Sequence, residues 1–232
     1  MKIGHASGNE ATKGAKTEMD KALSKGDEPI YVMRHGKTAL DAMKRSDGWL
    51  DFPLTDEGRR GIIPAQQYLK DLSPLVCIYA PPMKRNVETA EIIQSGMGID
   101  EPDIVICEEA KTWNLGKQLI GSQKYPARPI VKYFMDHPDE TPEGGESMNA
   151  FHKRFLTWIK GIMGEKRGGA VLIVLSGSSI RALSEHLTGD RESLELDEGG
   201  LMKMTPTGKM WNSNIIFGGK EQSEDDPTRY GS

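Results

Sequence analysis

Hydrophobic residues recur along this chain in two alternating patterns, short apolar runs and longer amphipathic stretches. The short runs predict strands at residues 29–33, 75–79, 103–107 and 170–175. The amphipathic stretches predict helices at residues 56–72, 84–94, 126–136, 147–163 and 179–187. Two later segments, 200–205 and 214–217, predict a closing β-hairpin. Strands separated by helices are typical of a three-layer α/β/α sandwich with a mostly parallel central sheet, and we expect that fold here.

Individual residues add further predictions for three of these elements. Ser147 fits the N-cap position of the helix at 147–163, whose apolar residues recur at helical spacing. Pro64 lies inside the helix at 56–72, and because proline has no backbone N–H we expect that helix to bend or be interrupted there. The run Ala170–Leu175 is the most apolar of the predicted strands, so we expect it at the centre of the sheet.

The hydrophobic pattern runs without a break from residue 29 to residue 218 and predicts a single domain. No Pro/Gly-rich linker long enough to divide it is present, and no internal repeat interrupts it. Residues 1–28 have almost no apolar periodicity and predict a flexible N-terminal arm. Residues 219–232 are charged and poor in apolar residues, and they predict a flexible C-terminal tail.

Composition excludes several classes of protein. The longest purely apolar run, Ala170–Leu175, is far shorter than the roughly 20 residues of a membrane-spanning helix, and residues 1–28 contain no apolar signal-peptide core. Cys77 and Cys107 are the two cysteines, too few for a disulfide framework or a cysteine-based zinc site. We therefore expect a cytoplasmic protein with no membrane partner. A net charge of −4 and the absence of a long basic stretch argue against nucleic acid as a partner.

Candidate chemistry follows the first predicted strand, where the sequence reads Arg34-His35-Gly36-Lys37-Thr38. A histidine at the end of a strand can present one ring nitrogen as a nucleophile while the backbone holds the other. The neighbouring arginine offers several donors to phosphate oxygens, glycine lets the backbone approach closely, and the threonine hydroxyl can donate as well. This combination predicts a phosphate-binding site.

The predicted parallel sheet indicates where in the fold this site lies. In parallel α/β sheets, ligands bind beyond the carboxyl ends of the strands. The residues at those ends, where we expect the site, are Arg34, Tyr79, Cys107 and Ser176.

The motif and four further segments make the chain resemble the histidine phosphatase superfamily, in its phosphoglycerate-mutase-like branch. Gly48–Gly58 resembles the family's G-W-x-D-x-P-L-T-x-x-G segment, and Tyr79–Ala90 resembles its S-x-x-x-R-x-x-x-T-A segment. Glu143–Ser147 resembles its P-G-G-E-S turn, and Val171–Gly177 falls where the family has its last catalytic strand. The matches run in family order along most of the chain.

The resemblance implies a phosphomonoester hydrolase in which His35 attacks phosphorus and forms a phosphohistidine. Arg34 and Arg85 would then hold the phosphoryl oxygens, because two guanidinium groups around a nucleophile form an electrostatic cradle for a dianion. The remaining residues expected to bind phosphate are Gly36, Thr38 and Gly177.

Two features of the family pattern are missing. The family ends its last strand with a V-x-H-G-like sequence, whereas Leu175-Ser176-Gly177 places Ser176 at the position of the second histidine. Serine can donate a hydrogen bond but carries no positive charge, and losing a donor of that kind costs about 10²–10³ in rate. The family's general acid would fall at Thr112, so Glu109, with Glu108 next, is the candidate acid here.

These departures leave three interpretations open. The first is an active phosphomonoesterase, suited to good leaving groups, that acts on a phosphorylated small molecule or a phosphoprotein. The second is a catalytically impaired phosphate-binding or protein-interaction pseudophosphatase on the same fold. The third, ranked last, is a phosphoglycerate mutase, because the mutases' basic substrate segment is not visible between Gly121 and Gly144. The oligomeric state is open, and a homodimer is common in such families.

The motif does not predict a metal centre. Asp41 and Asp51 follow it, but their spacing does not converge on a ligand set, and we expect both to be surface loop residues. The predicted site is cationic. We therefore expect no obligatory metal and no cofactor.

Overall fold

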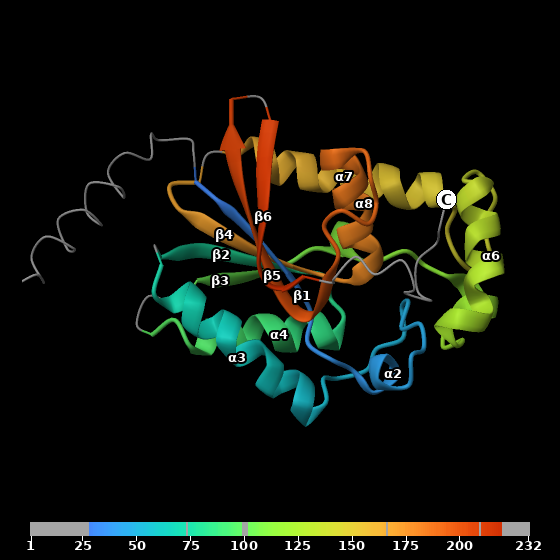
Figure 1. Cartoon of the computed structure of the whole chain (residues 1–232), viewed down its shortest axis with the longest axis horizontal. Coiled ribbons are helices and arrows are strands. Elements are labelled where there is room, and N and C mark those ends of the chain that lie inside the picture. The colour runs from blue at the N-terminus through green and yellow to red at the C-terminus, as the bar shows by residue number, and fades with distance from the viewer. Residues whose placement is uncertain (1–27, 73, 99–101, 166, 209, 220–232) are drawn as a thin grey trace, which may run out of the picture.

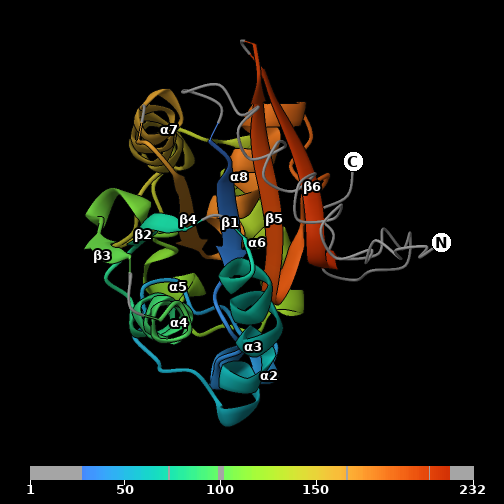
Figure 2. The ribbon, with the colours of Figure 1, turned by 90° about the vertical axis from the view of Figure 1, so that its left-hand side faces the viewer.

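The strands form one sheet in the order β3-β2-β4-β1-β5-β6, which can be followed from left to right in Figure 2. They span Ile30–Arg34 (β1), Leu75–Ala80 (β2), Asp103–Ile106 (β3), Ala170–Leu175 (β4), Leu196–Thr207 (β5) and Met210–Gly219 (β6). Neighbours among β1 to β4 are parallel, whereas β5 is antiparallel to β1 and β6 to β5. The computed structural model describes residues 28–72, 74–98, 102–165, 167–208 and 210–219. The predicted single-domain α/β fold with a mostly parallel sheet is confirmed.

Helices cover both faces of the sheet. They span Ala39–Ala42 (α2), Asp56–Lys70 (α3), Lys84–Ser95 (α4), Gly116–Leu119 (α5), Lys124–Asp136 (α6), Met148–Gly164 (α7) and Gly177–Thr188 (α8), with a short 3₁₀ turn, η1, at Glu108–Ala110. In Figure 1, α7 and α8 lie above the sheet and α3 and α4 below it. This arrangement gives the three layers that the alternation of strands and helices predicts.

Alternate side chains of the central strand β4 enter two different cores. Val171 and Ile173 pack with the apolar faces of α7 and α8, whereas Leu172 and Val174 pack with those of α3 and α4. The side chains of this strand are almost fully buried. The continuous apolar run therefore did mark the centre of the sheet, because a strand covered by helices on both faces has no polar side.

Cap residues fix where two helices begin. The Thr55 hydroxyl accepts a hydrogen bond from the backbone N–H of Gly58 at the start of α3, and the Ser147 hydroxyl accepts one from Ala150 at the start of α7. The N-cap predicted at Ser147 is confirmed. α3 continues through Pro64, so of the two expected outcomes, a bend or an interruption, the interruption does not occur. Pro64 is exposed, so the carbonyl that loses its helical partner faces the solvent side and can bond to water.

The closing hairpin is longer than the pattern predicted, with β5 and β6 extending well beyond 200–205 and 214–217. β6 is the edge strand and is only half-buried, so its apolar signal is weak over much of its length. The predicted arm at 1–28 and tail at 219–232 lie outside the described residues, apart from positions 28 and 219. No helix in the described segments has the length and apolar character needed to cross a membrane.

Candidate active site

A cavity of about 270 Å³ opens at the carboxyl ends of β1 and β4. The two strands are paired in register from Ile30 with Val171 to Arg34 with Leu175, so the residues that follow them lie side by side. The backbone N–H of His35 donates to the carbonyl of Leu175 at 3.0 Å. The cavity is lined by Arg34, His35, Arg85, Ser176 and Gly177 among others, and this brings together residues that lie more than 140 positions apart in the sequence.

The imidazole of His35 is held in one orientation. It is 2% exposed, and its Nδ1 lies 2.9 Å from the carbonyl oxygen of Gly36. Because a carbonyl only accepts, Nδ1 carries the proton and the Nε2 lone pair is free to react. Burial, followed by the positive charge of Arg85, lowers the pKa of His35 to about 3, although Asp41 acts in the opposite direction. The ring is therefore neutral at physiological pH, as a nucleophile must be.

Gly36 has a packing role that the motif alone did not show. A Cβ atom built at Gly36 would lie 2.7 Å from the carbonyl oxygen of Gly58, at the start of α3. Its backbone N–H donates to the hydroxyl of Thr89 at 3.1 Å. Gly36 thus lets the loop after β1 pack directly on α3, and neither its N–H nor its Cα lines the cavity.

Arg34 and Arg85 both line the cavity, but they are held differently. Arg34 donates from Nη1 to the carbonyl of Leu196 at 2.9 Å and pairs through Nη2 with Glu198 at 2.5 Å. Arg85 is fully buried and donates from Nη1 and Nη2 to the carbonyls of Leu50 and Gly48, each at 2.8 Å. The Nε atoms of both arginines are buried without a partner among the described residues.

Thr38 does not line the cavity. It is fully buried, caps α2, and its hydroxyl lies 2.9 Å from Asp41 Oδ2 and 3.0 Å from Asp47 Oδ1. One hydroxyl has one proton, so it can donate to only one of these two carboxyl groups at a time. The structure therefore gives Thr38, which lies outside the cavity lining, a structural role in which its hydroxyl contacts two acidic side chains.

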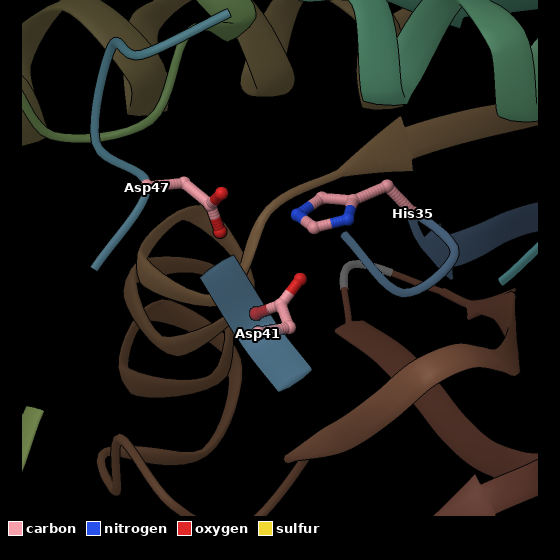
Figure 3. Close-up of side chains that lie close together, drawn as sticks. All are labelled: His35, Asp41 and Asp47. Carbon is pink, nitrogen blue, oxygen red and sulfur yellow. The ribbon is translucent and has the colours of Figure 1, made fainter. Parts of the chain in front are cut away.

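Asp41 and Asp47 are the acidic residues that sequence reasoning missed. Asp41 is 8% exposed and lines the cavity, so the expectation that it is a surface loop residue is wrong. Asp51, in contrast, is exposed as expected and pairs with Lys84. In Figure 3 the imidazole of His35 points toward the carboxyl groups of Asp41 and Asp47, which come from α2 and the loop after it.

The two carboxyl groups have opposite electrostatics. Burial opposes the ionisation of Asp41, but the positive charges of His35 in its protonated form, of Lys124 and of Arg34 outweigh it and hold the pKa of Asp41 below its usual range. For Asp47, burial and the charge of Asp41 dominate and raise its pKa. Lys124 donates to Asp41 Oδ1 at 3.1 Å. Asp41 is thus the ionised member of the pair, and Asp47 is the member that keeps a proton more readily.

Ser176 lies next to His35 and lines the cavity. It is 6% exposed, and its hydroxyl has no hydrogen-bond partner among the described residues. It is also the N-cap residue of α8, although its side chain makes no capping hydrogen bond. A buried hydroxyl without a partner is costly, so Ser176 offers a free donor to a ligand in the cavity.

Glu109 and Glu108 lie in η1 and are exposed, and neither lines the cavity. The wall that faces the cavity in this region is formed by Thr112 and Trp113 instead. Glu146 accepts hydrogen bonds from the backbone N–H of Asn114 and from Arg154, so it anchors the turn before α7. Among the histidines in the described segments, His35 alone lines the cavity. Tyr79 and Cys107 do not line it.

Basic side chains dominate the outer wall of the cavity. They come from the loop after α2, from α6, from α8 and from the loop that follows α8, and they are Lys44, Lys124, Arg128, Arg181 and Arg191. Together with Arg34 and Arg85 they outnumber the acidic lining residues Asp41, Asp47 and Glu198. The sequence offered no signal for this grouping, because its members are scattered over more than 140 positions.

Comparisons with known proteins agree with this geometry. The pattern that defines the histidine phosphatase superfamily (branch 1) matches residues 30–214. Phosphoglycerate mutase-like protein 4 of Arabidopsis thaliana is 28% identical over 171 residues, which cover 72% of this chain and 74% of that protein. A metal-independent phosphoserine phosphatase of the same plant is 25% identical over 165 residues, 68% of each chain.

A solved structure has the same fold. The crystal structure of a phosphoglycerate mutase from Bacillus anthracis str. Sterne superposes with a TM-score of 0.70 over 83% of this chain and 93% of that one, at 21% identity. The relatives thus include both a phosphatase and mutases.

Proposed function

The chain belongs to the histidine phosphatase superfamily, branch 1, and on that premise we propose that it hydrolyses phosphate monoesters through a phosphohistidine intermediate on His35. The observation that carries the proposal is the state of the His35 ring. Its Nδ1 is committed to the carbonyl of Gly36, its pKa is lowered to about 3, and Nε2 faces a cavity that Arg34 and Arg85 also line. A neutral, oriented imidazole between two guanidinium groups is suited to attack on phosphorus.

The reaction has two steps. In the first, the Nε2 lone pair of His35 forms a bond to phosphorus as the ester P–O bond breaks, and the leaving oxygen takes a proton from the site or from water. In the second, water attacks phosphorus, the P–N bond breaks, and inorganic phosphate leaves while Nε2 regains its lone pair. Arg34 and Arg85 stabilise the charge on the equatorial oxygens in both steps, and the unpartnered hydroxyl of Ser176 donates a further hydrogen bond.

Substrate preference follows from what the cavity offers. The exposed Glu109 is not placed to protonate a leaving oxygen in the cavity. Because Glu109 does not supply the proton, esters of acidic alcohols and phenols are expected to react best, since their leaving oxygen needs less protonation. The basic outer wall favours a substrate with negative charge beyond the phosphate itself, in a phosphorylated small molecule or a phosphoprotein.

The test is steady-state turnover of p-nitrophenyl phosphate by the full chain and by His35→Ala. We expect His35→Ala to reduce turnover by about 10³-fold or more, because the nucleophile is lost. Acid-labile, base-stable phosphate on the wild-type chain after rapid quenching would identify phosphohistidine. Lys37→Ala is a matched control, because Lys37 belongs to the same motif but pairs with Glu57 at the surface. Turnover that does not depend on His35 would contradict the proposal.

A second candidate is a pseudophosphatase that binds phosphate without hydrolysing it. The observation in its favour is the pair of carboxyl groups beside His35, Asp41 and Asp47, since negative charge next to the nucleophile opposes the approach of a phosphate dianion. Retained binding of inorganic phosphate with no His35-dependent turnover would support this candidate. Isomerisation of 3-phosphoglycerate in the presence of a bisphosphorylated primer would instead indicate a mutase.

A further inference from the structure

His35, Asp41 and Asp47 bring three ligand-type atoms together at the inner end of the cavity. One imidazole nitrogen and one oxygen from each carboxyl group lie within 4.8 Å of one another. The three residues come from the loop after β1, from α2 and from the loop after α2, and their side chains converge in Figure 3. We propose that these three residues form a binding site for a divalent transition-metal cation of the zinc class.

The geometry is close to that of a bound ion. A point equidistant from three atoms 4.8 Å apart lies about 2.8 Å from each, and bonds to zinc of about 2.0–2.2 Å need shifts of less than about 1 Å. Three protein ligands with an open fourth position are the usual arrangement of a zinc site that also binds water or a substrate group.

The ligand types select the class of metal. An imidazole with two carboxylates suits zinc and its neighbours in the first transition row, whereas magnesium and calcium prefer oxygen ligands alone. His35 is 2% exposed, and among the described residues its Nε2 makes no hydrogen bond, so this nitrogen is not committed elsewhere. Nδ1 donates to a backbone carbonyl, which is the usual outer contact of a metal-binding histidine.

The surrounding hydrogen bonds hold the carboxyl groups in place. Thr38 contacts both Asp41 and Asp47 through its hydroxyl, and its backbone N–H donates to Asp41 Oδ2 at 3.2 Å. Outer contacts of this kind fix the orientation of metal ligands. The buried Ser176 hydroxyl, which has no partner in the described chain, lines the same cavity and would gain one from a water on the ion.

The ion pairs of the nearby cations reach one of the two carboxyl groups, because among the described residues none involves Asp47. Arg34 directs its terminal nitrogens to Glu198 and the carbonyl of Leu196, and its Nη2 also lies 3.7 Å from Asp41 Oδ1. Arg85 directs its own to the carbonyls of Gly48 and Leu50. Lys124 reaches Asp41, but only through Oδ1. A dication between two carboxylates and a neutral imidazole forms a group without net charge, which removes the repulsion between Asp41 and Asp47.

A bound metal and the proposed phosphohistidine exclude each other, because both use the Nε2 lone pair of His35. This consequence rests on the proposed function, whereas the metal site itself does not. Zinc is therefore expected to inhibit turnover of a phosphate monoester, with relief by a chelator. Since binding can be measured without any substrate, failure of the metal site and failure of the phosphatase are distinguishable.

The experiment is titration of Zn²⁺ into the metal-free full chain, followed by isothermal calorimetry and by metal analysis after dialysis. We expect Asp47→Asn and Asp41→Asn each to weaken zinc affinity by at least about 10-fold relative to the wild type. Asp51→Asn is the matched control, because Asp51 follows Asp47 closely in the chain but is exposed and pairs with Lys84. It should bind zinc as the wild type does. Thermal unfolding of each variant verifies that it is folded.

The position of the bound ion is measured in a crystal of the full chain soaked in Zn²⁺. An anomalous peak between His35, Asp41 and Asp47 would establish the site. The proposal is overturned if zinc binds with the same affinity to wild type, Asp47→Asn and Asp41→Asn, because the ion then occupies another part of the chain. It is equally overturned if the folded wild type shows no saturable binding in the micromolar range.

Discussion

β1 and β4 end side by side in the cavity, but the polar groups that follow them are arranged differently. After β1, the Thr38 hydroxyl contacts two carboxyl groups, and the Arg34 guanidinium is shared between Glu198 and a backbone carbonyl. After β4, the buried hydroxyl of Ser176 has no partner in the described part of the chain. The polar groups at the end of β1 thus have partners within the chain, whereas the end of β4 carries a buried hydroxyl with no partner among the described residues.

Removal of one hydroxyl at each strand end tests this difference most strongly. Thr38→Val deletes the cap of α2 and the donor between Asp41 and Asp47, all of which are buried. We expect the free energy of unfolding to fall by about 2–4 kcal/mol, because a lost cap adds to the cost of an unsatisfied buried acceptor. Urea denaturation measures the change.

The matched change at the other strand end is Ser176→Ala. Because its hydroxyl has no partner, we expect the free energy of unfolding to change by less than about 0.5 kcal/mol. Equal losses in Thr38→Val and Ser176→Ala would show that the two strand ends are not different in the way described.

The pH dependence of stability tests whether His35, at the end of β1, is buried in its neutral form. The pKa of His35 is lowered from 6.5 to about 3, mainly by burial. Between these two pH values His35 is protonated in the unfolded chain and neutral in the folded chain. The contribution of His35 to stability is present at neutral pH and is lost as the pH falls toward 3. The expected slope is at most about 1.4 kcal/mol per pH unit.

Urea denaturation of wild type and His35→Gln, from about pH 7 down to about pH 4, isolates this contribution. The raised pKa of Asp47 acts in the opposite direction. The lowered pKa of Asp41, to which protonated His35 contributes, acts in the same direction as that of His35, at lower pH. We expect the wild type to lose stability faster than His35→Gln on acidification. Parallel curves would contradict a buried neutral His35.

The last prediction concerns the unpartnered hydroxyl at the β4 end. Ser176→His places an imidazole N–H donor beside His35, and we expect turnover of p-nitrophenyl phosphate to rise about 10-fold, part of the 10²–10³ that a preorganised donor contributes. Ser178→His is the control, because Ser178 lines the same cavity two residues further along, in the first turn of α8. An unchanged or lower rate in Ser176→His would mean that this position does not contact the phosphoryl group.

Most elements of the fold could be predicted, and those that could not share a cause. The central strand and the long helix α7 have enough apolar residues at a fixed period to be recognised. The helices α2 and α5 have four residues each, about one turn, so no apolar spacing can repeat in them. The edge strand β6 is half-exposed, so its apolar pattern is weak. Pro64 predicted a bend or an interruption, and the interruption does not occur because Pro64 lies on an exposed face of the helix.

The site was predictable only in part, for a related reason. His35, Arg34 and Arg85 stand in motifs, and the structure brings all three to one cavity. Asp41 and Asp47 gave no signal, because an aspartate in a loop is exposed in most proteins, and their burial depends on how α2 packs beside the end of β1.

The order of apolar runs along the chain was sufficient to predict the α/β architecture, and the motifs around His35 and Arg85 were sufficient to predict that Arg34, His35 and Arg85 share one site. Periodicity and local motifs are properties of neighbouring residues, and a linear sequence displays them directly. Only the tertiary structure decided that the Thr38 hydroxyl contacts two carboxyl groups, and that Asp41 and Asp47 converge on His35. Those facts depend on distances between separate segments, which packing sets once the sheet and its helices have assembled.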